Sequence, residues 1–335
     1  MRVAVTDYHT AGEPFRIVTD GLPDIPGETV LDRRSYAQQS DDVDAVRRLL
    51  VNEPRGHADM YGGFVVPGND DAAHFGVLFW HKDGYSTACG HGTIALGTWA
   101  VETGRVVAEV YGTTDVTIDV PSGRVVARVT CIDGRVSHVS FRNIPSYVVA
   151  RDVEVTTKRG PVRAGISYGG ALYASVAASQ VELAVRPEDY ADLVAIGREI
   201  KWALNDTDWA RHPTDSRLDG IYGTILYDDL GRTEDGPHQR NVTVFADGEV
   251  DRSPCGSGTS ARLALLADEG LITTGQVLTH ASIVGTRFIG RVLGQAQADG
   301  RTGVLTEVEG SAYQTGTATF TLDPRDPVGT GFVLR

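Results

Sequence analysis

The sequence lacks several features that would assign it at once to a class of protein. Its three cysteines among 335 residues include no Cys-x-x-Cys pair and are too few for a disulfide framework. It has no run of about 18 apolar residues, as a membrane span needs, and no N-terminal signal-peptide pattern. The net charge of −13 would repel a phosphate backbone. We therefore expect a cytoplasmic protein that binds neither nucleic acid nor membrane.

Glycine is abundant, at 39 positions, and it separates many short segments rich in β-branched side chains. These expected strands include 76–80, 125–129, 241–245, 303–308 and 317–322. Apolar spacing and end signals predict only four helices, over 41–52, 90–103, 187–204 and 257–269. No Pro-rich linker or charge block divides the chain. The pattern indicates many strands with a few helices buried among them.

One short motif occurs twice, about half the chain apart. Residues 89–93 and 255–259 both have the sequence Cys-Gly-x-Gly-Thr, and each precedes an Ala- and Leu-rich helical segment that ends at a glycine. Two matches in the same context suggest two related halves, although no clear repeat extends beyond them.

A cysteine at the start of a helix has a distinctive chemistry. The first turn offers unpaired backbone N–H groups and the positive end of the helix dipole. Both favour a thiolate, and we expect them to lower the pKa of Cys89 and Cys255. The same N–H groups can hold a carboxylate, and the glycines allow it to approach the backbone closely.

Two such motifs that face each other suit the inversion of an α-carbon. A thiolate on one face removes the proton, and a thiol on the other face delivers another. Fixed N–H donors on the substrate carboxylate would stabilise the charge that develops as the proton leaves.

Other interpretations of the cysteines are weaker. Cys131 lies in a β-type segment and is expected to be a buried core residue. Cys89, His91 and Cys255 could bind a metal ion, but zinc ligands usually cluster more tightly in sequence. Both motifs fit a loose dinucleotide fingerprint, yet the polar residues before them do not resemble the strand that it requires. We therefore expect no metal and no cofactor.

Beyond these motifs, five stretches together resemble one family, the proline racemases. They are His9-Thr10-Ala11-Gly12-Glu13-Pro14, residues 53–62, residues 84–91, residues 250–256, and Asp326-Pro327 with residues 331–334. The family includes 4-hydroxyproline 2-epimerases and trans-3-hydroxy-L-proline dehydratases, and the resemblance covers nearly the whole chain.

The resemblance implies an α+β fold like that of diaminopimelate epimerase. Each of two pseudo-symmetric halves wraps a mixed, mostly antiparallel sheet around a central helix. The first half, 1–128, would carry Cys89 and be joined by 310–335. The second half, 129–309, would carry Cys255, with the active site in the cleft between them. The family often forms homodimers.

The resemblance also implies roles for particular residues. Cys89 and Cys255 match the catalytic cysteines. The residues implied to bind a small amino or imino acid are Gly90, His91, Asp251, Gly256, Ser257, Phe79 and Phe245, of which the two phenylalanines are equally well explained by core packing.

The second cysteine separates two branches of the family. Dehydratases of the family have Thr at the position of Cys255, and elimination of water needs only one strong base, whereas inversion needs a second acid–base group. The sequence therefore favours a racemase or epimerase of proline or a hydroxyproline, without ranking the ring substituents. A dehydratase and a non-catalytic imino-acid-binding protein are the alternatives. Residues 227–239 are polar, and we expect a loop that could act as a lid.

Overall fold

The computed structural model describes residues 1–334 and divides the chain into two compact units. The first unit consists of Met1–Ala88, Gly92–Val139 and the chain from Ser311 onward, and the second consists of Cys89–His91 and Ser140–Gly310. The sequence interpretation ended the first half at residue 128 and assigned Cys89 to it. In the structure the first unit extends to Val139, and Cys89, Gly90 and His91 group with the second unit.

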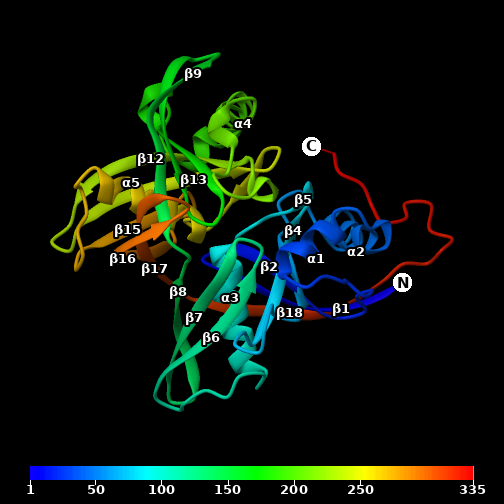
Figure 1. Cartoon of the computed structure of the whole chain (residues 1–335). Helices are drawn as coiled ribbons and strands as arrows, with labels where there is room; N and C mark the ends of the chain where they lie inside the picture. The colour runs from blue at the N-terminus through cyan, green and yellow to red at the C-terminus, as the bar shows by residue number, and fades with distance from the viewer. Residues whose placement is uncertain (335) are drawn as a thin grey trace. The chain divides into compact units, whose positions relative to one another are not determined.

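The first unit contains a mixed sheet and three helices (Figure 1). Its strands are β1 (Arg2–Thr10), β2 (Glu13–Asp20), β3 (Gly62–Val66), β4 (Phe75–His81), β5 (Gly84–Tyr85), β6 (Gly112–Val120), β7 (Gly123–Ile132) and β18 (Ala312–Thr321), while β8 (Arg135–Arg142) leads into the second unit. The strands pair in the order β18-β1-β2-β3-β4-β6-β7, with β5 also on β4. Only β2–β3 and β4–β6 are parallel.

Local sequence features explain where the helices of the first unit begin and which residues they bury. α2 (Asp41–Val51) follows the N-cap residue Ser40 and buries its apolar stripe, which includes Val43 and Leu49. α1 (Val30–Ala37), which the sequence analysis missed, begins with a capping box at Thr29. α3 (Gly90–Glu102) approaches β7 so closely at Gly97 that a Cβ there would lie 2.7 Å from the side chain of Ala127.

The second unit contains nine strands and two α-helices. The strands are β9 (Ser146–Thr157), β10 (Gly160–Tyr168), β11 (Leu172–Ala177), β12 (Ile221–Arg232), β13 (Pro237–Phe245), β14 (Glu249–Asp251), β15 (Val277–Ser282), β16 (Arg287–Ala298) and β17 (Arg301–Gly310). The helices are α4 (Tyr190–Asn205) and α5 (Gly256–Asp268), with short 3₁₀ segments at Ala178–Val181, Pro187–Asp189, Asp208–Ala210 and Ser216–Leu218.

The sheet of the second unit closes on itself around α5. The strands pair in the order β9-β10-β11-β12-β13-β15-β16-β17, and β17 pairs again with β9 through Gly303 and Val304. α5 contacts β9, β10, β11, β16 and β17, and every residue from Gly256 to Leu266 is buried. A helix buried on all sides is the core of the closed sheet. α4 packs against β9, β12 and β13.

The two units repeat one plan of elements. The series β1, β2, helices, β3, β4, β5, α3, β6 and β7 matches the series β10, β11, α4, β12, β13, β14, α5, β15 and β16. Each antiparallel or parallel pairing in the first series has its counterpart in the second. The related halves predicted from the repeated motif, and the α+β class, are therefore present in the structure.

The segment 227–239 is not the loop that the sequence suggested. β12 continues to Arg232 and β13 starts at Pro237, and the two strands pair as a hairpin. Its polar residues are compatible with a ladder because the backbone supplies the hydrogen bonds and the opposed pair Asp228 and Arg240 carries opposite charges. The short strand β5 covers Gly84 and Tyr85 before the first cysteine motif, contrary to expectation, whereas Arg252, Ser253 and Pro254 before the second motif follow β14 and lie outside any strand, as expected.

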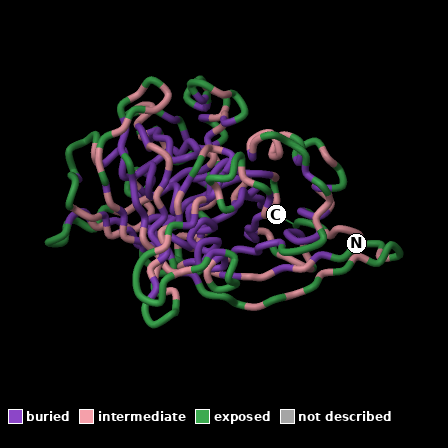
Figure 2. Tube along the Cα trace, turned by 60° about the horizontal axis from the view of Figure 1, so that its bottom comes forward, coloured by how far each residue is buried: buried purple, intermediate pink, exposed green. Residues whose placement is uncertain are grey.

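Burial differs between the strands. β4 and β11 are buried along nearly their whole length, whereas β18 is mostly exposed or half-buried. Figure 2 shows the buried segments in purple and the exposed ones in green. Among residues 1–334, no helix is both long enough and apolar enough to span a membrane.

Candidate active site

Each cysteine of the repeated motif lies directly before a helix. Cys255 is the N-cap residue of α5, and Cys89 is followed at once by α3. The motif folds this way because its glycines tolerate close contact at the first turn while the Ala- and Leu-rich segment continues as a buried helix. The predicted placement of both cysteines at helix starts is what the structure has.

The two helix starts touch through their glycines. A Cβ on Gly90 would lie 2.5 Å from Cα of Gly256, and a Cβ on Gly256 would lie 2.6 Å from Cα of Gly90. Both residues belong to the second unit. Only hydrogen fits at either position, so the backbones that carry Cys89 and Cys255 are in direct contact.

Cys255 is held in an unusual backbone conformation. Its φ is +62°, in the region that side chains other than glycine rarely adopt, at a cost of about 1–3 kcal/mol. Its thiol is buried, and a Cβ on Gly258 would lie only 2.9 Å from Sγ. The sulfur thus rests against the first turn of α5, where it accepts a hydrogen bond from the N–H of Gly258.

The electrostatics of Cys255 differ from the sequence expectation. Burial raises the pKa of its thiol far above the usual range, and the nearby charge of Asp251 raises it further. The N–H of Gly258 and the hydroxyls of Tyr173 and Thr243 act in the opposite direction without prevailing. The expected lowering of this pKa is therefore wrong for the free protein, because the loss of hydration outweighs the donors of the helix start.

Asp251 organises the turn before Cys255. Its Oδ1 accepts hydrogen bonds from the backbone N–H of Ser253 at 2.8 Å and from the Ser253 hydroxyl at 2.7 Å. The Ser253 Oγ in turn accepts the N–H of Cys255 at 3.1 Å. Burial raises the pKa of Asp251, and the hydrogen bonds from Ser253 offset part of that rise.

His91 connects the two motifs within the second unit. Its Nδ1 lies 3.4 Å from Sγ of Cys89 and 3.8 Å from Oδ2 of Asp251. The imidazole is buried, so it can exchange a proton with the first thiol while it faces the carboxylate beside the second. Four residues expected at one site, Cys89, His91, Asp251 and Cys255, are thus joined through these contacts.

An aromatic cluster borders the second motif. The Ser257 Oγ lies 2.7 Å from the hydroxyl oxygen of Tyr173, which lies 3.9 Å from Sγ of Cys255. Tyr222 packs edge-on against Tyr173, with centroids 5.7 Å apart, and stacks on Phe245 at 5.5 Å. Phe245 therefore joins the surroundings of Cys255.

Sequence reasoning missed Tyr173, Tyr222 and Thr243. They lie on β11, β12 and β13, and their approach to Cys255 depends on the pairing of these strands. No local motif marks them, because a strand residue looks the same in sequence whether it faces plain core or a functional group.

Phe79 belongs to the first unit. It lies on β4, fully buried, and packs edge-on against Phe15 with ring centroids 6.0 Å apart. Its role in a substrate pocket stays a prediction.

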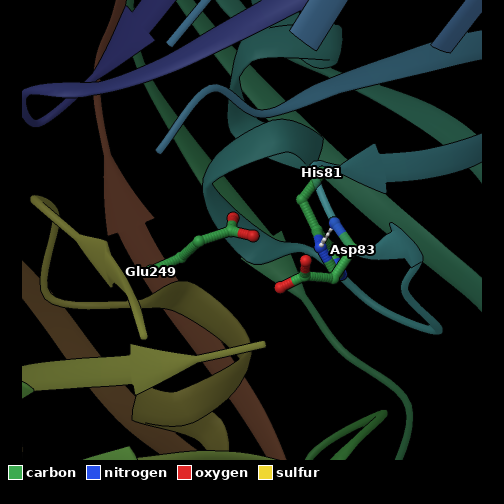
Figure 3. Close-up of side chains that lie close together, drawn as sticks. All are labelled: His81, Asp83 and Glu249. Atoms are coloured by element: carbon green, nitrogen blue, oxygen red, sulfur yellow. Dashed lines mark hydrogen bonds between the residues drawn. The ribbon is translucent and has the colours of Figure 1, made fainter. Parts of the chain in front are cut away.

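The turn after β4 carries titratable groups that the sequence analysis did not single out, of which His81 is buried and Asp83 is exposed. Figure 3 shows the backbone N–H of Asp83 donating to Nδ1 of His81, at 3.2 Å; Glu249, drawn in the same view, lies on β14 of the second unit. Arg47 donates to the carbonyl oxygens of His81 and Lys82 at 2.8 and 2.6 Å. These bonds hold the β4–β5 turn against α2.

Comparison with known proteins shows similarity along the whole chain. The family described as proline racemase matches residues 5–333. A trans-3-hydroxy-L-proline dehydratase of Burkholderia cenocepacia is 45% identical over 334 residues, 99% of this chain and 98% of the relative. A 3-hydroxyproline 2-epimerase of Burkholderia multivorans is 44% identical over the same shares.

A crystal structure gives the same result for the fold. A hydroxyproline epimerase from Agrobacterium vitis, with bound trans-4-hydroxy-L-proline, has a TM-score of 0.91 and 30% identity to this chain. The match covers 99% of this chain and 96% of that one.

Proposed function

Because the chain belongs to the proline racemase family, we propose that it inverts the α-carbon of free proline or a hydroxyproline, with Cys89 and Cys255 exchanging the proton. The observation that carries the proposal is the contact between the two helix starts at Gly90 and Gly256, which brings two thiols onto adjacent backbones. A dehydratase needs one such group, and an inversion needs two.

The proton balance of the reaction is simple. One cysteine, as thiolate, takes the α-proton, and the other, as thiol, gives its proton to the opposite face of the same carbon. The substrate leaves inverted, and the protonation states of the two sulfurs are exchanged. The two thiols perform both proton transfers, so the reaction as proposed requires no cofactor.

The surroundings suggest which sulfur starts as the acid. The raised pKa of Cys255 keeps it a thiol in the free protein. Cys89 has the imidazole of His91 3.4 Å away, which can take its proton. We therefore assign the first proton abstraction to Cys89 and the first proton delivery to Cys255.

The substrate carboxylate would bind the first turns of the two helices. N–H groups at Gly90 and Gly256 start these turns, and a helix start attracts an anion. Donors fixed on the carboxylate stabilise the charge formed at the transition state, by about 3–4 kcal/mol for a good one. His91 and Asp251 would face the ring nitrogen, with Ser257 and Phe245 beside the ring and Phe79 as its second wall.

We place 3-hydroxyproline first among the substrates. A relative at 44% identity carries the name 3-hydroxyproline 2-epimerase, and relatives of similar identity are named trans-3-hydroxy-L-proline dehydratase. Both names share the 3-hydroxyl group. The dehydratase is the second candidate function, and its product would be a cyclic imine with loss of water.

Proton NMR in deuterium oxide tests the proposal. L-proline, trans-4-hydroxy-L-proline and trans-3-hydroxy-L-proline would be incubated with wild type, Cys89→Ser and Cys255→Ser. Cys131→Ser is the matched control, because Cys131 lies buried on β7 of the first unit. We expect exchange of the α-proton with inversion of one substrate, abolished in the first two variants and retained in the control.

The other outcomes separate the alternatives. A product without the hydroxyl group would indicate the dehydratase, and binding without exchange would indicate a non-catalytic imino-acid-binding protein. The proposal also includes a cytoplasmic homodimer, and a monomer mass by light scattering would contradict that part.

A further inference from the structure

A fully buried polar cluster lies behind the turn that carries Cys255. It consists of His280 on β15, Asn241 on β13 and Thr259 on α5, each with 0% of its surface exposed. Nδ2 of Asn241 lies 2.8 Å from Nε2 of His280, and Oγ1 of Thr259 lies 2.8 Å from Nδ1. Both ring nitrogens therefore have partners inside the protein.

The hydrogen bonds of this cluster run in one direction. Oδ1 of Asn241 accepts from the Thr243 hydroxyl at 3.3 Å, which fixes the orientation of the amide. Nδ2 can only donate, so Nε2 of His280 accepts and Nδ1 carries the proton. Nδ1 then donates to Oγ1 of Thr259, whose own proton is free to go to the carbonyl oxygen of Pro254 at 3.2 Å.

The peptide between Pro254 and Cys255 is the end point of the cluster. Its carbonyl oxygen accepts from Oγ1 of Thr259 and, at 3.0 Å, from Nδ2 of Asn241. Its N–H, that of Cys255, donates to Oγ of Ser253 at 3.1 Å. The carbonyl of Cys255 accepts the N–H of Thr259 at 2.7 Å. Both peptide planes beside Cys255 are thus fixed, and with them its φ of +62°.

We propose that His280 is a positioning residue for Cys255: it fixes Asn241 and Thr259, which hold the Pro254 carbonyl and so keep the thiol in its strained, buried position. The inference rests on the proposed function of Cys255 for its effect on turnover, but its effect on the thiol itself does not depend on any substrate. The hydrogen bonds of His280 go to Asn241 and Thr259, so it acts on Cys255 through the backbone that these two side chains hold.

Loss of the His280 imidazole would remove two hydrogen bonds of the cluster at once. Thr259 would lose its donor and Asn241 one acceptor, and each could turn away from the Pro254 carbonyl. The peptide could then rotate and Cys255 leave the left-handed region, since Asn241 and Thr259 are the donors to that carbonyl among residues 1–334. A thiol freed from this position gains water, and its pKa falls toward the ordinary value.

The test compares His280→Leu and His280→Gln with His212→Leu in the full-length chain. His212 is a matched control, because it is also a buried histidine of the second unit, and its Nδ1 accepts from the N–H groups of Thr214 and Asp215, away from α5. The first readout is the rate of iodoacetamide alkylation of Cys255 relative to Cys89, by peptide mass spectrometry near neutral pH. The second is kcat and KM for α-proton exchange.

We expect Cys255 in His280→Leu to alkylate about tenfold faster relative to Cys89, as a pKa fall of about one unit implies. We expect kcat to fall by roughly 10- to 100-fold with little change in KM, because a misplaced group costs rate. His280→Gln, which keeps one polar partner, should lie between, and His212→Leu should leave the ratio unchanged.

Three results would overturn the inference: an unchanged alkylation ratio in folded His280→Leu, equal acceleration at both cysteines, or the same change in His212→Leu. If the wild type turned over none of the substrates, the proposed function would fail. The alkylation ratio would still decide whether His280 positions Cys255.

Discussion

A methyl group at position 258 would compete with the thiol of Cys255 for the same space. A Cβ on Gly258 would lie 2.9 Å from Sγ and 3.2 Å from Cβ of Cys255, and 3.2 Å from Cδ1 of Ile225. The first distance is about 0.6–1.1 Å shorter than an ordinary contact of about 3.5–4.0 Å. Since the helix backbone is buried on all sides, the sulfur is the group that must move.

The expected effects of Gly258→Ala on stability and on rate are different in size. Overpacking costs about 1–3 kcal/mol, and alanine regains about 0.5–1 kcal/mol in a helix, so the free energy of unfolding should fall by no more than about 2.5 kcal/mol. A sulfur displaced by nearly 1 Å should lower kcat about 100-fold. Unfolding by urea and α-proton exchange measure the two quantities.

Gly294→Ala is the matched control for this substitution. A Cβ at Gly294, on β16 of the same unit, has no atom within 4 Å. We expect that variant to keep kcat within about twofold, because an exposed or open site tolerates the methyl group. Wild-type kcat in a folded Gly258→Ala protein would refute the reasoning that the thiol must rest against the helix start.

Three further predictions concern the same unit. Burial lowers the pKa of His280 to about 3, so between about pH 6.5 and pH 3 the unfolded chain binds a proton that the folded chain does not, and stability falls by up to about 1.4 kcal/mol per pH unit as the pH drops. The raised pKa of Asp251 has the opposite effect on stability, but it does so in wild type and in His280→Leu alike. Urea unfolding should therefore show that the free energy of unfolding falls more steeply toward acid pH in wild type than in His280→Leu, and equal slopes would contradict this. Asp251→Asn should lower the pKa of the Cys255 thiol, and alkylation of this thiol should become about tenfold faster for each pKa unit of that fall. A slower reaction would show that the charge of Asp251 does not act on this sulfur. Tyr173→Phe removes a hydroxyl bonded to Ser257 and should lower kcat/KM about 2- to 13-fold in the exchange assay, whereas an unchanged value would leave that hydroxyl without a role.

The sequence predicted the features that local pattern encodes. The apolar stripe of α2, the four helical segments and the repeated Cys-Gly-x-Gly-Thr motif all correspond to elements of the structure. Membership of the chain in the proline racemase family confirms the resemblance drawn from five short stretches, and with it the racemase or epimerase class. The roles of individual site residues stay predictions for the experiments above.

Other features depend on long-range packing and were missed for that reason. α1 has only eight residues and little apolar character, although its capping box between Thr29 and Asp32 was a readable signal. The aromatic partner Tyr173 is separated from Cys255 by 82 residues of sequence. The pKa of Cys255 was expected to fall because a helix start is visible in sequence, whereas the burial that raises it is not.

The last long strand of the chain has a consequence for biosynthesis. β18 pairs along the full length of β1, from Arg2 opposite Thr321 to Thr10 opposite Ala312. This edge of β1 can therefore be paired only after β18 has been synthesised. At ~5–20 residues per second, a ribosome takes about 15–60 s to make the intervening chain. During that interval β1 offers an open edge to other nascent chains, while the second unit, whose strands are all made earlier, can already close. The nascent chain should therefore acquire a protease-resistant second unit first, and the first unit should become resistant only after residue 321 has left the ribosome.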